Sequence, residues 1–227
     1  MHEVNSFGQP LGDEVPQWAP RQRPVVDSLV GRYCTLRRLS AADVEPLFDA
    51  SAGDDALWTY MPYGPFVSPA AMAETLSSSR GDAIPYVIVV DGRVTGTASY
   101  LRCRPEHGSI EVGAVLFTPA LQRTAAATEA MFLMAEHAFG LGYRRYEWKC
   151  DDLNKASHRA ALRLGFTFEG VFRSDLVVKG RNRDTAWFSM LAREWPHHRA
   201  AFERWLHVGN FNAEGVQRRS LCSLRDA

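Results

Sequence analysis

The sequence has no excess of charge of either sign and no long hydrophobic run. Its 227 residues include 26 Lys and Arg and 26 Asp and Glu, so the formal net charge at pH 7 is zero. A balanced chain offers no overall attraction to nucleic acid or to an anionic membrane. No apolar stretch approaches the roughly 20 residues that span a bilayer. These absences argue against nucleic-acid and membrane partners.

Cysteine is scarce and widely spaced. Cys34, Cys103, Cys150 and Cys222 contain no C-x-x-C pair, whereas zinc sites and disulfide frameworks show closer or patterned spacing. We therefore expect reduced thiols, no bound metal and a cytoplasmic protein. The first residues show neither the basic region nor the apolar stretch of a signal peptide, which favours the same compartment.

What the chain does contain is a succession of strand and helix patterns, with 46% hydrophobic residues, enough for a full core. Strands are predicted over 32–38, 85–90, 94–102, 107–117, 143–150, 168–178 and 183–191. Helices are predicted over 41–50, 69–80, 125–141 and 154–166, and from residue 196. Because a strand meander precedes a single β-α-β unit, this order predicts one mixed α/β domain with a mostly antiparallel sheet and flanking helices.

Local signals fix several boundaries within this order. Ser40 is the expected N-cap of the first helix, with Asp43 in place of the capping-box Glu. Asp91–Arg93 (D-G-R) is a hairpin turn, since Asp-Gly tolerates the positive φ of type I′. Asn154 suits an N-cap, and Gly165 suits the C′ position of the same helix.

The two ends differ from the middle of the chain. Residues 1–28 carry four prolines and are predicted to form an extended arm, which Trp18 pins to the body. Residues 29–209 form the expected folded domain, and 210–227 read as a polar C-terminal tail.

The junction at Phe117–Thr128 is the best candidate anion site. A helix N-terminus offers unpaired N–H groups and partial positive charge, and phosphates bind there. The segment L-Q-R-T-A-A-A-T-E-A-M (121–131) has small residues but no glycine, and Arg123 could add a cationic contact. A buried helix start that needs small residues for packing explains the pattern equally well.

Three other places carry polar or aromatic candidates. Alternation in I-E-V-G-A-V puts Glu111, Gly113 and Val115 on one strand face. There a partly buried carboxylate could accept a proton, although an exposed strand residue is the commoner case. Asn154 and Ser157 share a helix face, either as cap and surface serine or as groups placed for a ligand. The aromatic loop W-T-Y-M-P-Y-G-P-F (58–66) either covers the core or shapes a substrate pocket.

In this order the segments resemble the GNAT superfamily of acyl-CoA-dependent N-acyltransferases. The closest likeness is to the Rim-type branch, which acetylates N-terminal amines of ribosomal proteins. The likeness covers about Val30 to Trp195 and rests on three motifs. They are I-E-V-G-A-V-L-F (110–117), Q-R-T-A-A-A-T-E-A (122–130), and N-K-A-S-H-R-A-A-L-R-L-G-F (154–166) followed by E-G-V-F-R (169–173).

The resemblance implies a GNAT-like fold and a role for each motif. Glu111 would be the general base for the acceptor ammonium, and Asn154 would contact acetyl-CoA or orient Ser157. Backbone groups of Val115, Leu116 and Phe117 would pair with the pantetheine arm like an added strand. The pyrophosphate would lie on the loop formed by Gln122, Arg123, Thr124, Ala125, Ala126, Ala127 and Thr128. Trp58, Tyr60 and Tyr63 would line the acceptor pocket.

Two departures from the family pattern change the expected details. The family's loop glycine falls on Ala125, so the loop is predicted to be an ordinary right-handed helix turn without positive φ. The family's tyrosine acid falls on Ala161, so the proton donor would be Ser157 or water.

The implied function is direct acetyl transfer from acetyl-CoA to a primary amine, on a small molecule or a protein N-terminus, without a metal. The alternatives are a catalytically silent acyl-CoA-binding module and an enzyme that uses a longer acyl group such as succinyl. A homodimer is compatible with the sequence on general grounds.

Overall fold

The computed structural model describes residues 3–78 and 81–226. Its strands form one sheet in the order β1-β2-β3-β4-β5-β6-β8-β7. The strands are β1 (Ser28–Val30), β2 (Thr35–Arg38), β3 (Ile84–Val90), β4 (Arg93–Arg104), β5 (Ser109–Phe117), β6 (Arg145–Asp151), β7 (Thr167–Val178) and β8 (Arg181–Leu191). Every pair of neighbours is antiparallel except β5 and β6, which are parallel. The predicted mixed α/β fold is confirmed.

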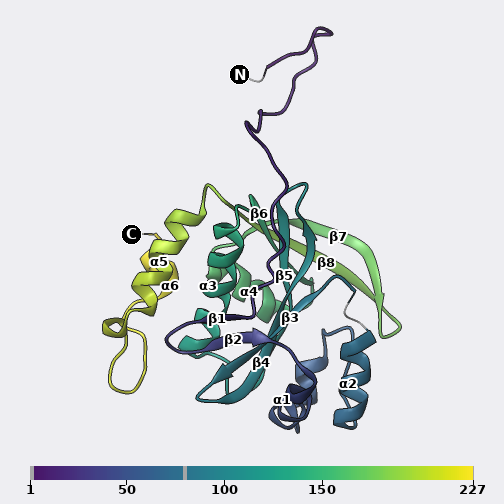
Figure 1. Cartoon of the computed structure of the whole chain (residues 1–227), viewed down its shortest axis with the longest axis vertical. Coiled ribbons are helices and arrows are strands. Elements are labelled where there is room, and N and C mark those ends of the chain that lie inside the picture. The colour runs from purple at the N-terminus through teal and green to yellow at the C-terminus, as the bar shows by residue number, and fades with distance from the viewer. Residues whose placement is uncertain (1–2, 79–80, 227) are drawn as a thin grey trace.

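The helices lie on both faces of this sheet (Figure 1). They are α1 (Val44–Ser51), α2 (Pro69–Ser78), α3 (Ala125–Gly140), α4 (Lys155–Leu164), α5 (Trp195–Leu206) and α6 (Leu221–Arg225), with 3-10 turns η1 (Ala41–Asp43), η2 (Asp55–Trp58) and η3 (Val208–Asn210). The predicted end of α2 near residue 80 lies outside the described residues.

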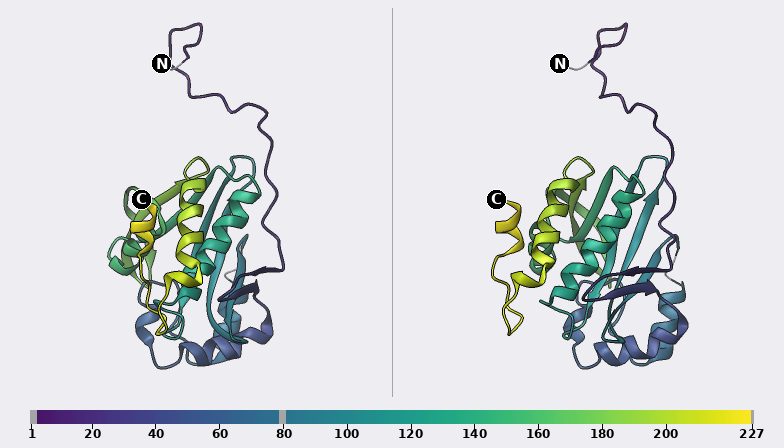
Figure 2. Two further views of the ribbon diagram at one scale, coloured as in Figure 1. Left: turned by 90° about the vertical axis from the view of Figure 1, so that its left-hand side faces the viewer. Right: turned by 60° about the vertical axis from the view of Figure 1, so that its left-hand side comes forward.

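The two faces of the sheet are covered differently. On the face that we call the helical face, α3, α4 and α5 bury an apolar core that includes Tyr100, Tyr146 and Phe188, and α3 and α5 lie side by side (Figure 2). On the opposite face, α1 and α2 cover a second cluster that includes Val87 and Leu116. The rest of that face carries charged side chains of β5, β6 and β8, and we call it the charged face.

The predicted boundary signals are confirmed. Ser40 and Asp43 form a reciprocal capping box, and Asp91 and Gly92 have φ of 48° and 76° in the turn between β3 and β4. The Asn154 side chain caps α4, and Gly165 ends it at φ 101°. These signals succeeded because each depends on only a few neighbouring residues.

The ends of the chain show one success and two omissions. The indole of Trp18 donates to the Glu106 carbonyl at 2.9 Å, so the arm is pinned as predicted, and the residues before it reach away from the body (Figure 1). The sequence analysis missed β1 and α6. Leu221 and Leu224 of α6 are buried in the main core, which the polar residues around them concealed.

Candidate functional site

The sheet opens between β5 and β6. β5 pairs with β4 as far as Phe117, opposite Gly96. It pairs with β6 only from Ser109 to Val112, opposite Arg145 to Trp148. Beyond Val112 the edge of β5 that faces β6 is therefore not paired with another strand. An extended ligand could pair with this edge as an added strand would.

A β-bulge lies at the start of the opening. Residues 114 and 115 of β5 together oppose Ala98 of β4, and Ala114 has a left-handed φ of 47°. The bulge reverses the alternation, so Val115 packs against the core of the helical face and Leu116 joins the cluster under α1 and α2. The prediction that Val115 shares a face with Glu111 is therefore wrong. An extra residue shifts every later side chain to the other face.

The loop that follows β5 presents free N–H groups at the start of α3. The N–H of Gln122 donates to Thr118, and the Thr124 side chain caps Ala127. Within the described residues, the N–H groups of Arg123, Ala125 and Ala126 have no protein acceptor. Three free donors at the positive end of a 16-residue helix are the groups that an anion site requires.

The conformation of this loop corrects one prediction. Ala125 is the first residue of α3, as expected for a right-handed turn. However, the loop does contain a left-handed residue, because Arg123 has φ 62°. Two residues of the predicted phosphate loop are engaged elsewhere. Gln122 donates its backbone N–H to the Thr118 carbonyl and its side-chain amide to the Phe117 carbonyl, and the buried Thr128 hydroxyl accepts from Arg163.

Glu111 lies on the charged face just before the opening and is 4% exposed. Its Oε2 is 2.9 Å from Arg102 Nε and 3.2 Å from Lys149 Nζ. Burial raises the pKa of the Glu111 carboxyl, and the two cations only partly oppose that effect. Oε1 accepts no hydrogen bond from any described residue. It lies beside Gly113, where a Cβ atom would come within 2.9 Å of it, so glycine leaves this oxygen accessible.

A second bulge brings Arg102 to Glu111. Arg102 and Cys103 of β4 together oppose Ile110, and Arg102 has a φ of 45°. Its guanidinium lies 2.6 Å from Glu147 and 4.5 Å from the centre of the Trp187 ring. The sequence analysis missed Arg102 because simple alternation places it on the other face.

The charged face continues outward from Glu111 as a network. Lys149 Nζ is 4.9 Å from the centre of the Trp187 ring, which is opposite it on β8. Arg145 bridges Glu147 at 2.7 Å and Glu169 at 2.8 Å. Three carboxylates and three cations thus alternate across β4, β5, β6 and β7.

Ser157 lies on the opposite side of the sheet from Glu111. Its hydroxyl accepts a hydrogen bond from Trp148 Nε1 at 2.9 Å, and Trp148 packs in the core of the helical face. Its backbone N–H donates to the capping Asn154. Because Trp148 is the last residue of β6 that pairs with β5, Ser157 and Glu111 approach the opening from different faces. With its oxygen accepting from Trp148, the Ser157 hydroxyl keeps its own proton to donate.

The aromatic loop covers both core and opening. Trp58 is buried and packs on Tyr63 and Phe66, so it is a core residue. Tyr60 is exposed, and its hydroxyl is 3.3 Å from the carbonyl oxygen of Leu153, in the turn after β6. Lys179 of the β7–β8 turn donates to the Trp58 carbonyl at 2.7 Å. The loop thus connects the turns that border the far end of the opening.

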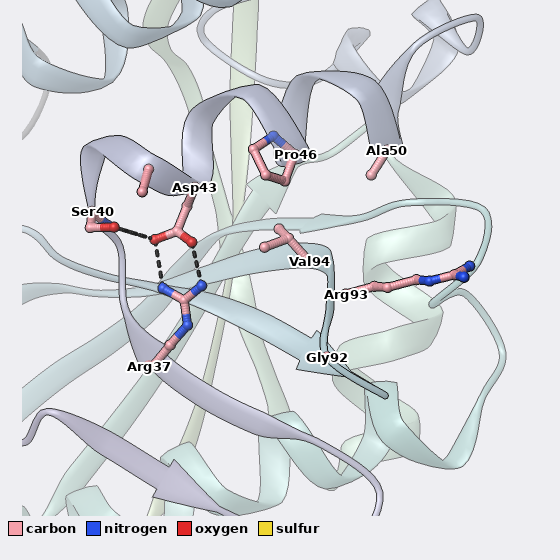
Figure 3. Close-up of a pocket in the computed structure, with 9 residues that line it drawn as sticks. Arg37, Ser40, Asp43, Pro46, Ala50, Gly92, Arg93 and Val94 are labelled. Carbon is pink, nitrogen blue, oxygen red and sulfur yellow. Dashed lines mark hydrogen bonds and ion pairs between the residues drawn. The ribbon is translucent and has the colours of Figure 1, made fainter.

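A separate hollow lies beside α1, away from the opening (Figure 3). There Arg37 forms a two-pronged ion pair with Asp43, which also accepts from Ser40, while Arg93 points away from both. Every polar group of this trio has a partner inside the trio. The hollow therefore presents no reactive group.

Two features are absent from the described residues. Within residues 3–78 and 81–226, His, Cys, Asp and Glu form no group that could hold a metal ion. No helix of that part of the chain is long and apolar enough to cross a bilayer.

Comparisons with known proteins agree on one family. A family model described as acetyltransferase (GNAT) domain matches residues 34–167. The crystal structure of a GCN5-related N-acetyltransferase from Brucella melitensis is 40% identical, with a TM-score of 0.90, over 94% of this chain and all of that one. An N-acetyltransferase p20 from Bacillus licheniformis, described as uncharacterized, is 27% identical over 75% of this chain and 99% of its own.

A more distant structure bears on the Rim-type resemblance. Mycobacterium smegmatis RimJ, in complex with CoA-disulfide, has a TM-score of 0.64 at 21% identity, over 78% of this chain and 89% of that one. At this identity the likeness concerns the fold alone, and it is compatible with the Rim-type branch.

Proposed function

Because this chain belongs to the GNAT family of acetyltransferases, we propose that it transfers an acetyl group from acetyl-CoA directly to a primary amine. The acceptor is an amine of a small molecule or of a protein N-terminus. The observation that carries the proposal is the unpaired edge of β5, which leads into the free N–H groups at the start of α3.

The opening has the chemistry that acetyl-CoA requires. The amide groups of its pantetheine arm would pair with β5 at Val115 and Phe117 as a strand does. Its pyrophosphate would lie on the N–H groups of Arg123, Ala125 and Ala126, with the Arg123 side chain as a further cation. The thioester would then lie where β5 and β6 separate, between Glu111 on one face and Ser157 on the other.

Each side of the opening would supply one proton transfer. Glu111 Oε1, directly or through water, accepts the proton of the acceptor ammonium. The amine attacks the thioester carbonyl, and a backbone N–H of β5 near Val115 stabilises the oxyanion. The carbon–sulfur bond breaks, and the Ser157 hydroxyl gives its proton to the departing thiolate. The attacking nitrogen releases its second proton to solvent as the amide forms, Ser157 regains a proton from solvent, and Glu111 returns its own proton to solvent.

Direct transfer fits the state of the cysteines. Burial raises the pKa of the Cys34, Cys103 and Cys150 thiols, that of Cys103 to about 11. A thiol that stays protonated is a poor nucleophile. Cys222 lies on the short helix α6, which packs on α5 and on the C-terminal end of α4, whereas Ser157 is in the first turn of α4. No cysteine is therefore suited to an acyl-enzyme intermediate.

Calorimetry with acetyl-CoA, free CoA and S-acetylpantetheine tests the binding mode. Acetyl-CoA and CoA should bind, and S-acetylpantetheine should bind more weakly because it lacks the pyrophosphate. Absence of binding by both CoA compounds at millimolar concentration contradicts the proposal.

A thiol-release screen across amine classes tests the reaction. Turnover with acetyl-CoA distinguishes the enzyme from a silent binding module. Parallel turnover with succinyl-CoA decides between acetyl and longer donors.

A further inference from the structure

We infer that the acceptor amine carries an anionic group, a carboxylate or a phosphate, within a few bonds of its nitrogen, and that Arg102 and Lys149 hold this group beside Glu111. The inference rests on the proposed function, since it takes Glu111 as the group that receives the proton of the amine.

The first step is the charge balance of the charged face. Three carboxylates and three cations form the network of contacting side chains. By alternation Asp151 and Arg183 lie on the same face, as do the exposed Arg104 and Arg181. The network is therefore neutral before an acceptor arrives, and the rest of the face adds no excess of negative charge. An acceptor with only an ammonium group brings one uncompensated positive charge into a largely buried site.

Proton transfer does not remove this charge. When Glu111 accepts the proton, the amine becomes neutral, but Lys149 loses the carboxylate that it faces. The site then carries the same net positive charge on the protein. Because an unpaired buried charge is costly, both states favour an acceptor with its own negative group. Such an acceptor keeps the site neutral before and after the transfer.

The second step concerns the N–H donors of Arg102 and Lys149 that remain available to an anion. Arg102 is 30% exposed, and its Nη1 has no acceptor among the described residues. Lys149 has three donor hydrogens but meets one carboxylate oxygen and the ring of Trp187. Because both cations lie against Oε2 of Glu111, they are within roughly 5 Å of Oε1, by addition of bond and contact lengths. This spacing sets the short separation between amine and anion.

The third step is the backbone of Arg102. A left-handed conformation is unfavourable for a non-glycine residue, and Arg102 adopts it at φ 45°. Its pairs with Glu111 and Glu147 engage Nε and Nη2, whereas Nη1 has no acceptor among the described residues. A bulge that turns a second cation into the site is explained if that cation also serves the acceptor.

Two matched pairs of amines test the inference. Phenylalanine is compared with phenylalaninamide, and phosphoethanolamine with ethanolamine, by kcat/KM for acetyl transfer. The pairs distinguish carboxylate from phosphate. Phenylalaninamide has the less basic amine and is the more reactive nucleophile at neutral pH, so a preference for phenylalanine cannot come from the amine itself. We expect the anionic member of at least one pair to be preferred about tenfold or more, the loss typical of one charge-assisted contact.

Variants then locate the preference. In Arg102→Gln and Lys149→Gln the kcat/KM values for the anionic amine and its neutral partner should become equal to within about threefold. This ratio is the readout, even if both absolute rates fall. Arg93→Gln, on the distant β3–β4 turn, is the matched control and should keep the ratio of the unaltered protein.

The outcomes separate this inference from the proposed function. If the neutral amines are acetylated as well as or better than the anionic ones, or if both variants keep the ratio, the inference is overturned and the proposed function stands. If acetyl-CoA binds but no amine of either pair is acetylated, the inference is overturned. If acetyl-CoA does not bind at all, the proposed function fails as well.

Discussion

Glu111 and Glu129 are two buried carboxylates that differ in how many of their oxygens have hydrogen-bond partners. Glu111 is 4% exposed and Glu129 is 5% exposed. Both oxygens of Glu129 accept backbone N–H groups, from Arg32, Tyr33 and Cys34 at 2.6–2.9 Å. Glu111 faces two cations through one oxygen, and its other oxygen has no partner in the part of the chain that the structure describes. Burial alone therefore does not mark a reactive group. The free oxygen of Glu111 fits the proposed role of proton acceptor, whereas Glu129 is a structural tie between α3 and the β1–β2 turn.

The sharpest test of this comparison is Glu111→Gln, which keeps the shape and removes the base. We expect kcat/KM for acetyl transfer to fall by about 10²–10⁴, the usual contribution of general base catalysis. Acetyl-CoA affinity should stay within a few-fold, because the proposed phosphate site lies at the start of α3. Steady-state thiol release and calorimetry measure the two quantities. If Glu111→Gln keeps a third or more of the kcat/KM of the unaltered protein, Glu111 is not the general base.

Glu129→Gln should break the other half of the comparison. An amide places donors against backbone N–H groups, so at least one of the three hydrogen bonds is lost. We expect about 1–3 kcal/mol lower free energy of unfolding, the cost of an unsatisfied buried donor. Urea denaturation followed by fluorescence measures it, with the exposed Glu106→Gln as control. The folded Glu129→Gln variant should retain the kcat of the unaltered protein. A rate loss as large as that of Glu111→Gln would contradict the division into a catalytic Glu111 and a structural Glu129.

The pH dependence of Glu111 gives a third test. Since burial raises the pKa of its carboxyl, kcat/KM should fall as the pH drops through a value above the ordinary glutamate pKa. Lys149 opposes this rise, so Lys149→Met should raise the pKa further and move the acidic limb toward higher pH. A shift of about one unit or more is typical for the loss of a nearby opposite charge. A limb that moves toward lower pH, or stays in place, contradicts the assignment.

The sequence predicted the order of elements and most of their ends because these depend on local signals. Hydrophobic periodicity, the cap at Asn154 and the glycine at Gly165 act within a few residues. The resemblance of the three ordered motifs added the family. Glu111 was recognised as a candidate because a carboxylate between apolar strand residues is conspicuous.

The sequence could not predict the two bulges that build the site. Arg102 and Ala114 adopt left-handed backbone although neither residue type favours it, so pairing with neighbouring strands imposes these conformations. Arg123 is also left-handed, at φ 62°, but it lies in the loop between β5 and α3, where the sequence analysis predicts no positive φ. The bulges decide which side chains meet on the charged face. Alternation alone therefore misplaced Val115 and overlooked Arg102.

The free N–H groups at α3 offer a further contrast with the N–H groups that Glu129 fills. Arg123→Asn removes the charge but tolerates positive φ, whereas Arg123→Val disfavours that conformation. We expect the asparagine variant to weaken acetyl-CoA binding several-fold, with a weaker salt dependence, and the valine variant to weaken it more. Roughly tenfold is the scale of one strained or lost contact. Equal affinities for the two variants, measured by calorimetry, would show that the loop conformation does not matter.

Ala125 tests the same loop from the helix side. Ala125→Gly should keep acetyl-CoA affinity within a few-fold, because this residue is right-handed and needs no glycine. Ala125→Val should weaken binding by crowding the phosphates against the first turn. Unchanged affinity in the valine variant would count against phosphate binding at this turn.

Asp43 is a third buried carboxylate and gives the smallest expected effect. Burial alone would raise the pKa of this carboxyl, but hydrogen bonds from Arg37 and Ser40 outweigh it and hold the pKa below its ordinary value. Because the folded-state pKa is lowered, the stabilisation is present above the unfolded-state pKa and is lost as the pH falls through the folded-state value. Asp43→Asn should cost about 1 kcal/mol at neutral pH, the worth of a helix cap with a largely solvent-screened partner.

Urea denaturation of Asp43→Asn at several pH values gives the decisive comparison. The difference in free energy of unfolding between Asp43→Asn and the unaltered protein should disappear in acid, where Asp43 is protonated in both the folded and the unfolded state. The difference caused by Glu129→Gln is measured at the same pH values for comparison. Neither kcat nor acetyl-CoA affinity should change, because every polar group around Asp43 is engaged within its own trio (Figure 3). If Asp43→Asn did change catalysis, a carboxylate whose oxygens all have partners would influence the opening. A free carboxylate oxygen would then no longer separate a catalytic group such as Glu111 from structural groups such as Glu129 and Asp43.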